Sequence, residues 1–97
     1  MHPVSTEYRL LIVDDEKSIL RGLELSIGRT FPILTASSGQ EGLEVFKSKG
    51  PFPIVISDFI MPKMNGAVFL EEIRKLDSEV VTMLLTGGAN FDQIADA

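Results

Sequence analysis

Three acidic residues of this chain directly follow short apolar runs. Asp14 and Asp15 follow the run at residues 10–13, and Asp58 follows the run at residues 54–57. If these runs are neighbouring parallel strands, their carboxyl ends meet at the sheet edge where open α/β sheets bind ligands. Two carboxylates about 4 Å apart repel each other by roughly 4 kcal/mol at an effective dielectric constant near 20. The cluster therefore needs protons or a cation, and a cation beside a carboxylate nucleophile suggests phosphoryl chemistry.

The acidic residues divide into a pair and a single residue. Oxygen ligands of this kind suit Mg²⁺, which keeps several waters and accepts phosphate oxygens. Asp58 stands alone and is the better candidate for a nucleophile that forms an aspartyl phosphate, while Asp14 and Asp15 hold the metal ion. The alternative interpretation is that acids before a helix only cap its free amide groups.

A hydroxyl and two glycines follow another apolar run, at residues 80–85. Thr86 offers a donor for a phosphoryl oxygen, and Gly87 and Gly88 allow the backbone to approach closely. Taken alone, Thr86 is better explained as an ordinary threonine at the end of a strand.

Apolar runs alternate with amphipathic stretches, which predicts repeated βα units and a parallel sheet. The short run at residues 33–36 is expected at an edge, and the apolar run at residues 54–57 in the centre. The helix at residues 17–28 is expected to bury Ile19, and that at residues 66–76 to bury Leu76. The full set comprises strands at residues 9–13, 33–36, 54–57 and 80–85, and helices at residues 17–28, 39–49 and 66–76, with another helix from about Phe91.

Composition limits the class of protein. The chain has 97 residues, enough for one small domain, and no cysteine, which excludes a disulfide framework and a thiolate metal site. The net charge of −5 argues against direct nucleic acid contact by this segment. No apolar run is long enough to cross a membrane and no leader precedes the first one, so a cytoplasmic location is expected.

Three segments together resemble the receiver domain of the response regulators of two-component signalling systems. They occur in the order and spacing typical of that family and span nearly the whole chain. The segments are LIVDDE at residues 11–16, ISDFIMPKMNG at residues 56–66 and LLTG at residues 84–87.

The resemblance implies an α/β fold of the flavodoxin-like, doubly wound type, with a parallel sheet of strand order 2-1-3-4. Residues 1–97 would form one receiver domain that is incomplete at its C-terminus, because the fifth strand and fifth helix are missing. The family's invariant lysine belongs to that fifth strand, so the chain should hold only the metal-binding half of the site. The apolar run at residues 80–85 also indicates an interior strand, completed by a longer protein or by another chain.

The resemblance also assigns roles to residues. It implies that Asp58 accepts a phosphoryl group from the phosphohistidine of a sensor histidine kinase, or from a small donor. It implies that Asp15 and Asp58 bind Mg²⁺ directly with the backbone carbonyl of Ile60, and that Asp14 acts through water. The chain would thus catalyse its own phosphorylation and dephosphorylation without being a classical turnover enzyme.

The same resemblance describes a switch. Thr86, with Gly87, would move to the phosphoryl group and change the surface near the fourth helix, while Ile60 and Gly88 would tune the lifetime of the phosphoryl group. An output domain or effector would lie outside this chain. The alternative function is a docking or dimerisation module that works without phosphorylation, including a homodimer paired through the exposed edge of the fourth strand.

Overall fold

The structure is a computed structural model that describes residues 9–85. The expected strands and helices of this range are confirmed, with ends that differ by one or two residues. The expected helix from Phe91 lies outside the described residues. No helix in the described part of the chain has the length and apolar character needed to span a membrane. The elements, in order, are β1 (Leu10–Val13), α1 (Lys17–Ser26), β2 (Ile33–Ala36), α2 (Gly39–Lys49), β3 (Ile54–Asp58), α3 (Gly66–Leu76) and β4 (Val81–Leu85).

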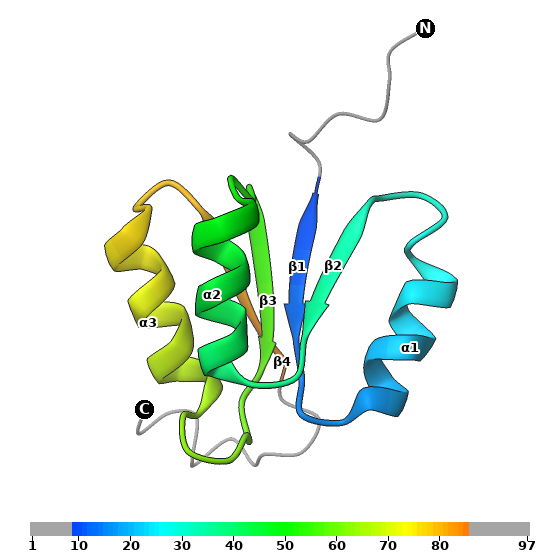
Figure 1. Cartoon of the computed structure of the whole chain (residues 1–97), viewed down its shortest axis with the longest axis horizontal. Helices are drawn as coiled ribbons and strands as arrows, with labels where there is room; N and C mark the ends of the chain where they lie inside the picture. Colours follow the sequence, from blue (N-terminus) through cyan, green and yellow to red (C-terminus); the bar gives the residue numbers. More distant parts are fainter. Residues whose placement is uncertain (1–8, 86–97) are drawn as a thin grey trace, which may run out of the picture.

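The four strands form one parallel sheet in the order β2-β1-β3-β4. The expected flavodoxin-like order 2-1-3-4 is therefore confirmed. Figure 1 shows α1 on one side of the sheet and α2 and α3 on the other, which is the doubly wound arrangement. Because all strands run the same way, their carboxyl ends lie at one edge of the sheet.

Alternating residues of the central strands form two hydrophobic cores. Leu11 and Val13 of β1, with Val55 of β3, pack against aromatic and aliphatic side chains of α2 and α3. Leu10 and Ile12 face the other way and pack with α1. The four residues of β1 are all buried, as expected for a strand covered on both faces.

The helix α1 is shorter and less buried than its sequence suggests. It ends at Ser26 rather than Gly28, because the chain then tightens into a turn in which Thr30 N–H donates to Ile27 O at 2.9 Å. Ile19 was expected on the buried face but is 44% exposed. The α1 face that meets the sheet is a narrow stripe of Leu20, Leu23 and Ile27.

The helices α2 and α3 begin at side-chain caps. The Ser38 hydroxyl accepts the Glu41 N–H at 3.0 Å, and the Asn65 side chain accepts the Val68 N–H at 2.9 Å. Each cap satisfies an amide that has no partner within its helix. Asn65 thus fixes the start of α3 directly after the loop that follows Asp58.

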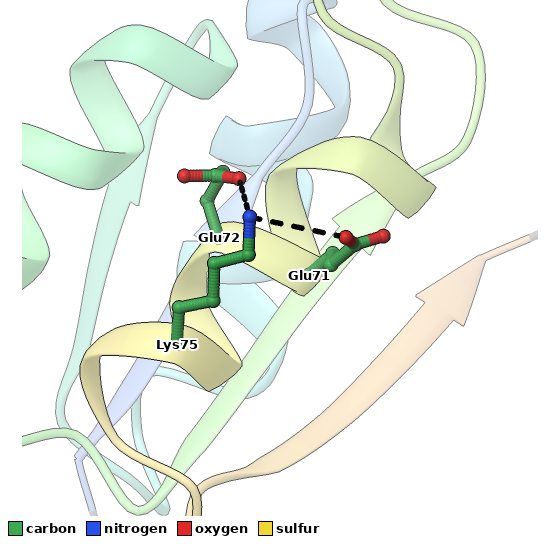
Figure 2. Close-up of polar contacts among 3 residues, drawn as sticks. All are labelled: Glu71, Glu72 and Lys75. Carbon is green, nitrogen blue, oxygen red and sulfur yellow. Dashed lines mark hydrogen bonds and ion pairs between the residues drawn. The ribbon is translucent and has the colours of Figure 1, made fainter.

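The outer face of α3 is charged and solvated. Figure 2 shows Lys75 between Glu72 and Glu71, with N–O distances of 3.0 Å and 4.0 Å. Such exposed pairs contribute little to stability. Leu76, expected on the buried face, is 49% exposed at the end of the same helix. The apolar contacts of α3 come instead from Phe69, Leu70 and Ile73.

The strand β4 exposes one apolar face. Among the described residues it pairs only with β3, and Val81 and Met83 are 55% and 50% exposed. These two side chains border an apolar groove of about 510 Å³ on the α1 side of the sheet, whose other wall includes Ile27 and Phe31.

Candidate functional site

Three carboxylates meet at the carboxyl edge of the sheet. One oxygen each from Asp14, Asp15 and Asp58 lies within 4.8 Å of the others. The strand register explains this meeting, because Val13 of β1 pairs with Ser57 of β3, and the acidic residues follow these two positions. The structure thus brings together the three acids that the sequence singled out.

The three acids differ in environment. Asp14 is buried, and its Oδ1 accepts the Glu16 N–H at 2.9 Å. Asp15 is exposed and Asp58 is half-buried. The residue that caps α1 is Glu16, and it makes no side-chain cap hydrogen bond. Asp14 thus satisfies the free amide of the residue that caps α1, so capping stays an alternative interpretation for Asp14.

The pKa of the Asp58 carboxyl is raised above its ordinary value. Burial is the largest cause, and the negative charge of Asp14 is the next. The neighbouring Phe59 amide acts in the opposite direction, and the charges of Asp15 and Glu16 add smaller increases. A cation close to the three acids would favour the charged form of the Asp58 carboxyl and so lower its pKa.

The loop between β3 and α3 has a defined backbone. The Met64 N–H donates to Pro62 O at 2.7 Å, and Lys63 between them has φ 70°, which together form a tight three-residue turn. Positive φ is uncommon for a residue with a side chain. Ile60, in the same loop, is 46% exposed. The direction of its carbonyl towards a metal ion stays a prediction.

The part of the expected site that follows β4 is not described. Thr86, Gly87 and Gly88 lie outside the described residues, so their roles stay predictions. The last residue of β4, Leu85, pairs with Asp58 in the strand register.

The donor set fits a hard divalent cation such as Mg²⁺. It consists of carboxylate oxygens from Asp14, Asp15 and Asp58, close enough to share one ion, and the site is partly open to solvent. Mg²⁺ binds through one or two carboxylates and keeps several waters, which a partly open site allows. Burial is the largest cause of the raised pKa of Asp58, and the negative charge of Asp14 is the next; a cation would offset this second cause.

One residue of the site escaped the sequence analysis. Ser57 is fully buried in β3, and its hydroxyl donates to the backbone carbonyl of Asp58 at 2.8 Å. The signal was a single polar residue inside an apolar run, directly before the central acid.

Comparison with known proteins gives a consistent result. A family model described as the response regulator receiver domain matches residues 10–97. Among curated proteins, the probable transcriptional regulator ycf27 of Guillardia theta is 42% identical over 84 residues, covering 86% of this chain and 32% of that protein. The chain spans about a third of the length of the curated transcriptional regulators it matches.

Solved structures show the same likeness. A response regulator receiver domain protein from Clostridium thermocellum matches with TM-score 0.80 and 34% identity, covering 88% of this chain and 69% of that chain. A chain from the complex of histidine kinase ThkA with response regulator protein TrrA matches with TM-score 0.76 and 36% identity, covering 86% of this chain and 72% of that chain.

Proposed function

Because the chain belongs to the response regulator receiver domain family, we propose that it is a phosphoacceptor signalling switch in which Asp58 accepts the phosphoryl group. The observation that carries this proposal is the meeting of Asp58 with Asp14 and Asp15 within 4.8 Å. A lone nucleophilic carboxylate facing an acidic pair has the geometry that a metal-assisted phosphoryl transfer needs.

The proposed step is a transfer between two side chains. An Asp58 carboxylate oxygen forms a bond to phosphorus while the P–N bond of the phosphohistidine on a sensor histidine kinase breaks, and the electron pair of that bond returns to the imidazole nitrogen. A small donor such as acetyl phosphate would serve through the same attack. Asp58 must be ionised to attack, so its raised pKa favours the reaction at neutral rather than acidic pH.

Mg²⁺ would supply charge neutralisation between the carboxylates and the phosphoryl oxygens. Asp15 and Asp58 would ligate the ion directly, together with the Ile60 carbonyl, and Asp14 would act through water. The hydrogen bond from Glu16 N–H supports this division, because it already occupies Oδ1 of the buried Asp14 and leaves the exposed Asp15 freer to move.

The response to phosphorylation is proposed to start at Thr86, with Gly87, and to change the surface near the fourth helix. The pairing of Asp58 with Leu85 supports this, because Thr86 is the next residue in sequence after Leu85. Ile60 and Gly88 would set how readily water removes the phosphoryl group. The apolar Ile60 side chain can offer an attacking water no hydrogen bond, which favours a long-lived phosphoryl group.

The proposed partners are a sensor histidine kinase and an output domain or effector. The likeness to a chain from the ThkA–TrrA complex supports the first, and the greater length of the curated relatives supports the second. We also propose a cytoplasmic location. The net charge of −5 argues against direct nucleic acid contact. In this scheme the chain catalyses its own phosphorylation and dephosphorylation.

Phosphoryl incorporation tests the proposal. The wild-type chain should take up ³²P from a phosphorylated histidine kinase or from labelled acetyl phosphate in the presence of Mg²⁺, and Asp58→Asn should not. Asp77→Asn is the matched control, because Asp77 lies beyond α3 and its Oδ1 accepts the Glu79 N–H, which an asparagine oxygen can also do. Equal labelling of Asp58→Asn and the wild type would end the proposal.

A second candidate function rests on β4. The exposed Val81 and Met83 and the apolar groove beside them favour a docking or dimerisation module, including a homodimer paired through this strand. Sedimentation velocity of the wild type, Asp58→Asn and Val81→Lys separates the two functions. A dimer that persists in Asp58→Asn and is lost in Val81→Lys, with no Mg²⁺ response of the amides near Asp58, would favour docking.

A further inference from the structure

Ser57 is an isolated buried hydroxyl directly beside the central acid. Its side chain is fully buried, and its Oγ donates to the backbone carbonyl of Asp58 at 2.8 Å and lies 4.0 Å from Met61 Sδ. A buried hydroxyl costs free energy unless it is hydrogen-bonded, so a strand that only needed to fill this space would be served by an apolar residue. The hydrogen bond to the Asp58 carbonyl provides the partner that this buried hydroxyl requires.

The backbone at the end of β3 is constrained from several directions. Phe59 N–H donates to Leu85 O at 3.2 Å, and Gly66 N–H donates to Phe59 O at 2.8 Å. A Cβ placed on Gly66 would lie 2.0 Å from the Asp58 carbonyl oxygen, so the start of α3 sits directly against this carbonyl. The Ser57 hydroxyl is the one side-chain donor to that oxygen among the described residues.

The Ser57 hydroxyl donates to a backbone carbonyl and not to a carboxylate. Successive side chains of a strand point to opposite faces. Val55 belongs to the core under α2 and α3, and Ser57 follows it on that face, whereas the Asp58 carboxylate meets Asp14 and Asp15. We propose that Ser57 is a positioning residue, whose hydrogen bond to the Asp58 carbonyl fixes how β3 presents the Asp58 carboxylate and the following loop to a divalent ion.

This inference rests on the proposed function for its metal, but its structural part can be measured without one. Ser57→Ala removes the hydroxyl and leaves the Asp58 carbonyl without that donor. Ile73→Val is the matched control, because Ile73 is fully buried in the same core and has no polar side-chain atom that could bond to the acids. Both variants remove little volume, and both should fold.

Two readouts are needed. In the metal-free chain, hydrogen exchange of the Phe59 and Gly66 amides should quicken about 5-fold or more in Ser57→Ala relative to the amides of β1, whereas Ile73→Val should show no such local difference. In an NMR titration with Mg²⁺, Ser57→Ala should bind about 3- to 10-fold more weakly than wild type, which is the worth of one ordinary hydrogen bond.

The outcomes separate this inference from the proposed function. Exchange and Mg²⁺ affinity that both match the wild type in Ser57→Ala would overturn the positioning role, as would equal local effects in Ile73→Val. If the wild-type chain itself binds no Mg²⁺ and takes up no phosphoryl group, the proposed function fails. The positioning role is then decided by the exchange of the Phe59 and Gly66 amides alone.

Discussion

Val13 and Ser57 are register partners in the adjacent parallel strands β1 and β3. Asp14 and Asp58, the residues that follow them, therefore lie at the same level at the carboxyl edge of the sheet. The strand pairing brings the carboxylates together despite their mutual repulsion, which is a cost that the rest of the fold must offset. A site under such repulsion should respond to cations, to pH and to the loss of a charge.

Magnesium should stabilise the folded chain. A ligand that binds only the folded state at a concentration 100 times its dissociation constant adds about 2.7 kcal/mol to the free energy of unfolding. Asp15→Asn should lose most of this gain, whereas Asp77→Asn should keep it. Urea unfolding with and without Mg²⁺ measures the difference. An Asp15→Asn variant that gains as much as the wild type would show that Asp15 is no ligand.

The charge of Asp58 should destabilise the metal-free chain at neutral pH. Its pKa is raised in the folded state by burial and by Asp14, so the folded chain binds the proton more tightly than the unfolded chain. Stability is then lost as pH rises from the ordinary carboxyl pKa through the raised one.

Asp58→Asn removes this charge. It should raise the free energy of unfolding at neutral pH by less than about 1 kcal/mol, since the site is partly open to screening. The gain should vanish in acid, below the ordinary carboxyl pKa. Urea unfolding across a pH series in metal-free buffer checks both parts. A wild type that is more stable than Asp58→Asn at neutral pH would contradict this prediction.

The same substitution should have opposite effects in two helices. A Cβ on Gly42 of α2 would lie 2.8 Å from the Phe69 ring and 2.9 Å from Val13 Cγ2, whereas one on Gly22 of α1 meets nothing within 4 Å. Gly42→Ala should therefore destabilise the chain by about 1 to 2 kcal/mol. Gly22→Ala should stabilise it by about 0.5 to 1 kcal/mol. Thermal unfolding of both variants tests this, and a shift of the same sign would refute it.

The tight turn after Asp58 should prefer glycine. Lys63 has φ 70°, a conformation that costs a residue with a Cβ about 1 kcal/mol. Lys63→Gly should therefore be more stable than Lys63→Ala by about that amount. The comparison with alanine removes the effect of losing the lysine side chain. Urea unfolding of the two variants decides the matter, and a more stable alanine variant would show that the turn relaxes.

The sequence predicted the elements well because each carries a clear periodic pattern, but it overestimated two buried faces. Ile19 and Leu76 lie at helical spacing from buried residues and are nevertheless exposed. Periodicity predicts which side of a helix is apolar, whereas the number of residues buried on that side depends on the elements that cover it. For α1 the covered stripe is limited to the line of Leu20, Leu23 and Ile27.

The acids of the site could be predicted because their positions follow from where strands end. Ser57 and Lys63 could not. The contact of Ser57 depends on which way its hydroxyl turns in the core, and the φ of Lys63 depends on the whole loop. Asn65 and Gly66 lie close by and would accept positive φ more readily. Asn65 instead caps α3, and Gly66 is the residue at which α3 closely approaches Asp58.

The adjacency of β1 and β3 also bears on how the molecule matures. Roughly forty residues, including β2 and two helices, separate Asp15 from Asp58 along the chain, so no short fragment can assemble the acidic site by itself. A partly folded chain would hold its acids apart from one another. Under the proposed phosphoacceptor function, the ability to accept a phosphoryl group would therefore appear only once β1 and β3 have paired.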